Sequence, residues 1–258
     1  MRSELLKALA EAGVEKGDIL FVHSDASPVL GLGNIFRPNE TLDLLIESFL
    51  EAVGPQGTFM VPTFNYDFCQ GKPYVHEETP SQVGLLSNRV LRDPRAKRSF
   101  HPIYSAAAIG AAAGDLTAGV SKSSFGEGSI FQRLHQRNAK LVFFNVSFYY
   151  CTFIHYVEQT LGVDYRFLKS FTGSVAVGGR EYSDTFDFYA RYLDRDIVLD
   201  LTRLERDLMA QTRMKKGLFM GKFPVLQVRS DDVFKEASRR VSSEPYYLLK
   251  HPPALLKP

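Results

Sequence analysis

His155 and Glu158 are the residues whose types and spacing point most directly to chemistry. In a helix, positions three apart lie on one face, where a carboxylate orients an imidazole and stabilises its protonated form. Such pairs are also common on solvated helix faces, but the flanking run 148–157 is rich in aromatic and aliphatic residues. We therefore expect the pair in a cleft or in a satisfied part of the core, and a cleft would make His155 a general base.

Three further segments carry residues of the kinds that bind ligands. The run His23-Ser24-Asp25-Ala26-Ser27 lacks the Gly-x-Ser-x-Gly elbow of a nucleophilic serine, so we interpret it as a binding loop. Gly31 and Gly33 resemble part of a phosphate-cradling loop, without its third glycine and without the Gly-Lys-Ser/Thr ending of a P-loop. Residues 126–129 offer backbone N–H groups to an anion, although a plain turn with two glycines is the more common explanation.

Neither a metal site nor a disulfide framework is expected. His76, His135 and His251 form no ligand spacing with one another. The two cysteines, Cys69 and Cys151, belong to no Cys-x-x-Cys pair. This usage fits a reducing cytoplasm.

The composition is that of an ordinary globular protein, with 258 residues, 45% hydrophobic and 23% charged, and 31 Lys and Arg against 29 Asp and Glu. A net charge of +2 gives no field that would concentrate a nucleic acid, and aromatic residues are scarce around the basic run 92–98. The first residues lack the apolar core of a secretory signal, and no segment supplies the ~18 consecutive apolar residues of a membrane span. We expect a cytoplasmic protein without nucleic-acid or membrane partners; base rates for enzymes of this size allow a homodimer.

Short apolar strands precede the segments that could do chemistry. Residues 19–22, 58–61 and 141–146 are predicted strands, and amphipathic patterns predict helices over 3–12, 39–50, 81–91 and 152–161. This alternation predicts an α/β fold with a mostly parallel central sheet flanked by helices. Ligands of such sheets bind at the carboxyl ends of the strands.

The last third of the chain changes character. Segments 174–177 and 180–186 flank Gly178-Gly179 as the arms of a β-hairpin do, which predicts an antiparallel β extension in the C-terminal third. Residues 65–80 show no sustained period, so we expect a long functional loop there. Because no linker, repeat or low-complexity stretch separates these parts, we expect a single domain over residues 1–258.

Six motifs in order, spread over roughly residues 5 to 240, resemble the aminoglycoside 3-N-acetyltransferase family. They are Gly17-Asp18 with His23-Ser24, Val53-Gly54 through Pro62-Thr63-Phe64, Thr79-Pro80-Ser81 with Gly84, Arg98-Ser99-Phe100-His101-Pro102, Gly128-Ser129-Ile130-Phe131, and His155-Tyr156-Val157-Glu158. Members of this family use acetyl-coenzyme A (acetyl-CoA) to acetylate an amino group on a sugar ring. No single motif is decisive, but six in order are specific.

The resemblance implies roles for individual residues. His155, held by Glu158, would take a proton from the attacking amine in a direct transfer without a covalent enzyme intermediate. The loops 23–33 and 126–129 would hold the coenzyme phosphates, with Thr63 and Ser105 near the pantetheine or thioester. The expected coenzyme-binding residues are His23, Ser24, Ser27, Gly31, Gly33, Thr63, Ser105, Gly128, Ser129 and Phe131. The expected acceptor-binding residues are Asn65, Tyr66, Asp67, Tyr149 and Tyr150.

The chain departs from the family pattern on the acceptor side. Aromatic rings in 145–152 replace small residues, and Asn88 stands where the family has an acidic residue. A polycationic aminoglycoside favours an acidic cleft, whereas aromatic faces and amides suit sugar stacking and hydroxyl contacts. The expected activity is therefore acetyl transfer from acetyl-CoA to an amino sugar, including nucleotide-linked sugars of surface glycan biosynthesis. Transfer to an aminoglycoside in antibiotic resistance is the alternative within the family.

Three other hypotheses stay open on the sequence. The chain would be a non-catalytic CoA-binding protein if the rings at 148–150 close the acceptor side. It would be a thioester hydrolase if His155 activates water. It would use a different acyl donor if the pocket holds a larger or a formyl group.

Overall fold

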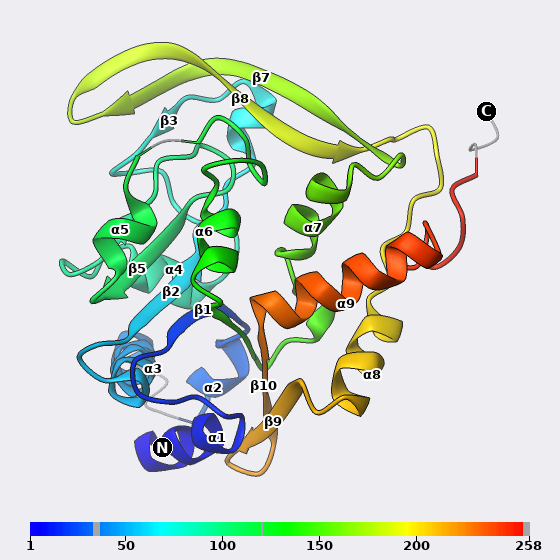
Figure 1. Cartoon of the computed structure of the whole chain (residues 1–258). Coiled ribbons are helices and arrows are strands. Elements are labelled where there is room, and N and C mark those ends of the chain that lie inside the picture. The colour runs from blue at the N-terminus through cyan, green and yellow to red at the C-terminus, as the bar shows by residue number, and fades with distance from the viewer. Residues whose placement is uncertain (33–36, 120, 255–258) are drawn as a thin grey trace.

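A seven-stranded mixed sheet lies at the centre of the computed structural model, which describes residues 1–32, 37–119 and 121–254 (Figure 1). In spatial order its strands are β4 (Lys97–Arg98), β5 (Ala106–Gly110), β2 (Thr58–Pro62), β1 (Ile19–Ser24), β6 (Lys140–Phe144), β10 (Phe223–Arg229) and β9 (Met214–Phe219). Only the pairs β1–β2 and β1–β6 are parallel, and the other four are antiparallel. The expected α/β class is confirmed, but a mostly parallel sheet is wrong.

The direction of the outer strands explains this error. A short buried strand is an apolar run in either direction, so the runs at β5 and β10 carry no mark of their orientation. An antiparallel extension was expected in the C-terminal third, and β9 and β10 of that third add to the edge of the main sheet beside β6. The sequence pattern helix, strand, helix, strand therefore describes only the parallel centre of the sheet.

Helices cover both faces of the sheet. One layer holds α1 (Arg2–Glu11), α2 (Ser27–Leu30), α3 (Pro38–Val53) and α4 (Leu85–Val90), and the other α5 (Ala113–Thr117), α6 (Ile130–Gln136), α7 (Ile154–Leu161), α8 (Thr202–Ala210) and α9 (Ser230–Ser243). Strand β1 is buried on both faces: Leu20 and Val22 pack in the first layer, and Phe21 packs against Phe131 in the second. This double burial is why its sequence is a continuous apolar run.

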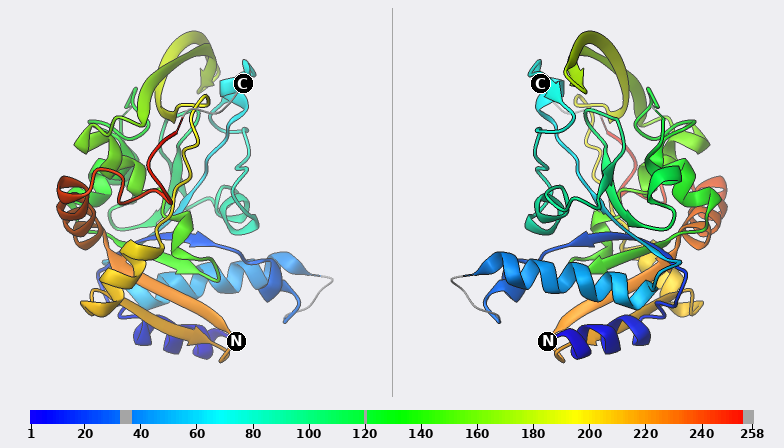
Figure 2. Two further views of the ribbon diagram at one scale, coloured as in Figure 1. Left: turned by 90° about the vertical axis from the view of Figure 1, so that its right-hand side faces the viewer. Right: turned by 90° about the vertical axis from the view of Figure 1, so that its left-hand side faces the viewer.

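The predicted hairpin forms a second sheet. Strands β7 (Arg166–Val177) and β8 (Arg180–Arg191) pair antiparallel, and β3 (Tyr74–Val75) pairs parallel with β7. Gly178 and Gly179 turn the chain with φ of 55° and 74°, as a two-residue hairpin turn requires. The hairpin arches above α6 and α7, and in both views of Figure 2 it lies at the opposite end of the molecule from α1.

Two local predictions change in detail. The helix expected from residue 81 starts only at Leu85, because Gly84 before it adopts a φ of +116° that is outside the helical region. The expected loop 65–80 contains the 3₁₀ helix η1 (Asp67–Gln70) and β3, which tie it to the hairpin. Within the described residues, no helix combines the length and the apolar character that crossing a membrane demands.

His101 makes the fold sensitive to acid. Its Nδ1 accepts hydrogen bonds from the backbone N–H groups of Ile103 and Tyr104 at 3.1 and 3.0 Å, and burial lowers its pKa to about 3. The unfolded chain therefore binds a proton that the folded chain excludes, so stability is lost as pH falls below about 6.5.

We expect that His101→Asn, which keeps an acceptor but cannot titrate, reduces this loss. Between pH 7 and pH 5, His101 alone should contribute about 2 kcal/mol to the fall in the free energy of unfolding. Urea unfolding at the two pH values measures it. An equal fall in wild type and variant would contradict the assignment.

Candidate active site

The first turn of α7 holds His155 against Glu158. The helix follows the 3₁₀ helix η2 (Phe148–Tyr150), and three residues separate η2 from the end of the buried strand β6. His155 Nδ1 lies 2.7 Å from Glu158 Oε2; the histidine side chain is 20% exposed and the glutamate is fully buried. The rings of Phe125 and His155 pack edge to face, with centroids 5.3 Å apart. The expected contact between His155 and Glu158 is therefore present, and part of the His155 side chain remains exposed.

Arg166 completes a buried charge cluster that the sequence did not indicate. It is the first residue of β7, and its Nε lies 2.7 Å from the same Oε2 of Glu158. Its side chain is 7% exposed, so the guanidinium and the carboxylate are desolvated together. An arginine five residues beyond the end of a helix carries no periodic signal, and only the reversal of the chain at Gly162 brings it back to α7.

Burial, Glu158 and Arg166 together set the protonation of His155. Burial lowers the pKa of His155, the Arg166 guanidinium lowers it further, and Glu158 opposes both without reversing the shift. Burial raises the pKa of Glu158, but Arg166 and His155 outweigh it, so the net shift is downward. Near pH 7 an ionised Glu158 faces a neutral imidazole, which must therefore carry its proton on Nδ1. Nε2 is then a free base.

Arg166→Gln should raise the pKa of His155, because the cation that disfavours the imidazolium is gone while Glu158 remains. The acid limb of the pH–rate profile for kcat/KM then moves to higher pH. Arg166→Lys keeps a cation and serves as the matched variant, with a limb close to that of wild type. An unchanged limb in Arg166→Gln would contradict the coupling.

His155 lines a cavity of about 480 Å³ under the hairpin, which we name the His155 cavity. The rest of the wall is formed by Tyr149, by both strands of the hairpin near its open end, and by residues between 193 and 199. Tyr149 was expected to bind the acceptor and does lie beside His155 here. The residue is 54% exposed.

A second cavity of about 720 Å³, the strand-end cavity, lies where β1, β2 and β6 end. His23 and Ser24 line it, together with Tyr66, Tyr150 and Thr152. His23 Nε2 is 3.3 Å from Thr152 Oγ1, which joins the end of β1 to the turn that precedes His155. Burial lowers the pKa of His23 to about 3, so the ring is neutral. Thr152 was not among the residues expected at the site, although it stands three residues before His155.

The other residues expected at the coenzyme lie apart from these two cavities. Thr63 Oγ1 and Ser105 Oγ are 2.8 Å apart, both are buried, and neither lines either cavity. Ser27 begins α2, where its N–H is accepted by Asp25 Oδ1 at 3.0 Å, and Gly31 directly follows that helix. Gly33 lies outside the described residues.

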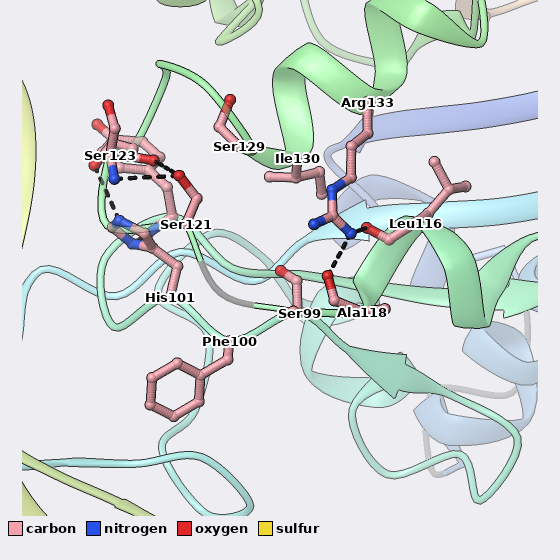
Figure 3. Close-up of a pocket in the computed structure, with 14 residues that line it drawn as sticks. Ser99, Phe100, His101, Leu116, Ala118, Ser121, Ser123, Ser129, Ile130 and Arg133 are labelled. Carbon is pink, nitrogen blue, oxygen red and sulfur yellow. Dashed lines mark hydrogen bonds between the residues drawn. The ribbon is translucent and has the colours of Figure 1, made fainter.

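Residues 128–131 form the N-terminal end of α6 and the turn before it. Ser129 Oγ accepts the N–H of Gln132 at 3.3 Å as a helix cap, and Phe131 is fully buried in the core. Gly128 and Ser129 border a small third cavity of about 20 Å³, with His101 and Arg133 around it (Figure 3). This cavity shares no lining residue with the other two.

The side chains of two expected acceptor residues are bonded to other groups of the protein. Asn65 is 2% exposed; its Nδ2 donates to Pro80 O at 3.0 Å, and its Oδ1 accepts the N–H of Asp67 at 2.9 Å. Asp67 pairs with Lys72 at 3.1 Å. Neither Asn65 nor Asp67 lines the His155 cavity or the strand-end cavity, so the structure does not bring them together with the base.

Known proteins share this sequence pattern. A family model described as aminoglycoside 3-N-acetyltransferase matches residues 21–242. Aminoglycoside N(3)-acetyltransferase IV of Salmonella sp is 28% identical over 255 residues, which cover 98% of this chain and 91% of that protein. Aminoglycoside N(3)-acetyltransferase III of Salmonella sp is 29% identical over 226 residues, which cover 78% of this chain and 74% of that protein.

Solved structures share the fold at lower identity. The apoenzyme of aminoglycoside acetyltransferase AAC(3)-IVa has a TM-score of 0.77 at 23% identity, over 97% of this chain and 92% of that one. AAC-IIIb in its binary complex with CoASH has a TM-score of 0.76 at 20% identity, over 93% and 97%. The family match extends over most of the chain and over the His155 site, and this protein belongs to the aminoglycoside 3-N-acetyltransferase family of CoA-dependent N-acetyltransferases.

Proposed function

We propose that this protein moves the acetyl group of acetyl-CoA to a primary amine on a sugar ring, with His155 as general base and Glu158 as its partner. The observation that carries this proposal is the 2.7 Å contact between His155 Nδ1 and Glu158 Oε2, at a ring that lines a cavity. The contact leaves Nε2 as a proton acceptor on the ring that borders the space an amine would enter.

The proposed reaction is a direct transfer. The amine nitrogen attacks the thioester carbonyl carbon, and as the C–N bond forms its proton passes to Nε2 of His155. Breaking the C–S bond releases the sulfur, which takes that proton from the imidazolium, so the products are an amide and a free thiol. Glu158 stabilises the transient imidazolium, and a base so placed contributes a rate factor of about 10²–10⁴.

The strand-end cavity is the proposed place of the donor. It opens at the carboxyl ends of β1, β2 and β6, where α/β sheets bind ligands, and it offers the hydroxyls of Ser24 and Thr152. The backbone of Thr152 accepts the N–H of His155 at 3.1 Å, so the donor side and the base lie on one turn of the chain. Ser27 and Gly31, which follow β1, are proposed to contact the coenzyme beyond this cavity.

For the acceptor, the comparisons support an aminoglycoside better than a sugar of glycan biosynthesis. The related enzymes are named for aminoglycosides, and structures of AAC(3)-IVa hold apramycin and a gentamicin. A smaller amino sugar stays as the second candidate because of Tyr149 and Tyr150. Both residues are more than half exposed, and each lines one of the two cavities with an aromatic ring, on which a sugar can stack.

Thiol release from acetyl-CoA over a panel of aminoglycosides, amino sugars and nucleotide-linked amino sugars tests the proposal. We expect release only with an amine, and an acetylated acceptor by mass spectrometry. Equal release without any amine would instead indicate a thioester hydrolase. Binding of coenzyme A with no turnover on any acceptor would favour a binding protein.

A further inference from the structure

The His155 cavity is cationic. Its described lining includes Arg166, Lys169 and Arg191 but no aspartate or glutamate. Arg166 is balanced by Glu158, whereas Lys169 and Arg191 have no carboxylate oxygen at salt-bridge distance among the described residues. Arg191 donates instead to the backbone oxygen of Ile197 at 2.9 Å, and the Lys169 ammonium lies 5.1 Å from the ring centroid of Phe171. Two unbalanced cations thus border the space beside the base.

The three cations lie close together at the open end of the hairpin. Arg166 and Arg191 are opposite each other at its open end, although like charges opposite each other destabilise a strand pair. Lys169 is opposite Phe188, whose ring packs toward Tyr104 and Phe125 in the core. Because opposite residues share a face, Lys169 lies on the same face of the hairpin as Phe188.

Such a lining opposes a polycation and attracts an anion. An acceptor amine arrives largely as an ammonium, which two unbalanced cations would repel unless a negative charge accompanies it. The strand-end cavity differs, since its described lining holds Asp25 and no lysine or arginine. The rest of the His155 cavity includes the aromatic rings of Phe167 and Phe171, which suit the flat face of a sugar or of a nucleobase.

We infer that the acceptor carries an anionic group, a phosphate or a carboxylate, besides its amine, and that Lys169 and Arg191 bind this group while His155 receives the proton of the amine. The inference rests on the proposed acetyl transfer, and of its two candidate acceptors it favours the second, an amino sugar, in a form that carries an anionic group. Coenzyme A is also an anion, but the base must contact the amine, and the base lines this cavity and not the strand-end cavity. We therefore assign the acceptor to the His155 cavity.

The first test is independent of turnover. With the coenzyme site saturated by CoA, we expect calorimetry to show saturable binding of pyrophosphate or malonate, the first as the phosphate probe and the second as the carboxylate probe. Lys169→Glu should weaken it by about tenfold or more, and Lys169→Met by less. Lys222→Glu is the matched control, because Lys222 also lies over a ring, 5.4 Å from that of Phe223, but far along the chain on the β9–β10 turn. No binding, or equal binding by all variants, overturns the inference.

The second test uses acceptors. Among amines that share one scaffold, such as glucosamine, glucosamine 6-phosphate and glucosaminuronate, we expect the anionic ones to have the higher kcat/KM, with a preference that falls as salt rises. Lys169→Glu should reverse the preference and leave the KM for acetyl-CoA unchanged. A raised KM for acetyl-CoA would place the coenzyme phosphates in this cavity, and a preference for cationic aminoglycosides in wild type would also overturn the inference. If no amine is acetylated, the proposed function is contradicted. The binding of pyrophosphate and malonate then decides alone whether the cavity is an anion site.

Discussion

Replacing His155 by alanine is expected to lower kcat for acetyl transfer by about 10²–10⁴, with little change in the KM for acetyl-CoA. The reason is the loss of Nε2, the base that the buried Glu158 orients at the cavity wall. The strand-end cavity, where we place the donor, does not include His155, so coenzyme binding should persist. Initial rates of thiol release at saturating amine measure the effect.

His135 provides a matched control for this variant. Its side chain is also 20% exposed, it faces Asp231 at 3.6 Å, and it lies on α6, where its Nδ1 is 3.1 Å from the hydroxyl of Tyr156. His135→Ala should therefore retain kcat within a small factor. A comparable loss in both variants would mean that His155 acts through packing and not through proton transfer.

Glu158→Gln is expected to lower the free energy of unfolding by about 3–5 kcal/mol, because it leaves the Arg166 guanidinium desolvated without a counter-charge. Turnover should fall as well, since the amide neither fixes Nδ1–H nor stabilises an imidazolium. Adding Arg166→Met removes the unpaired charge, so the double variant should regain much of the stability but not the activity. Chemical unfolding with parallel rate measurements separates the two effects.

Glu236 supplies the comparison. It is 3% exposed on α9, but its partners Arg239 and Arg240 keep 58% and 34% of their side chains in solvent. Glu236→Gln should thus cost less stability, because those guanidinium groups stay hydrated, and it should leave turnover unchanged. If Glu158→Gln were as mild as Glu236→Gln, the buried cluster would not hold the site together.

Local patterns in the sequence were sufficient to locate the elements that carry the site. The apolar runs placed β1, β2 and β6, and Gly178-Gly179 placed the hairpin turn. Strand direction could not be obtained this way, because a five-residue apolar run such as β5 has the same pattern whether it runs with or against its neighbour. The expectation of a mostly parallel sheet failed at those outer strands.

The site itself was predictable only where its residues are neighbours in sequence. His155 and Glu158 share one helix face, so their spacing together with their apolar flanks indicated a pair. Arg166 and Lys169 reach the same cavity through the fold of the hairpin over α7, and no spacing rule connects a strand to the helix before it. Ser129 illustrates the converse, because its hydroxyl caps α6, a role that the glycine and serine pattern of 126–129 did not indicate.

The pH dependence of kcat/KM for the preferred amine, compared between wild type and His155→Ala, tests the central claim most directly. In wild type two protons must be lost, one from the ammonium of the acceptor and one from His155, whose pKa burial and Arg166 hold below its usual value. The logarithm of kcat/KM should therefore rise with a slope of about 2 at the acid end and bend to about 1 below pH 6.5. His155→Ala should show a slope of about 1 throughout that range. A slope of about 2 that persists in His155→Ala would contradict the account, because another group would then be the base.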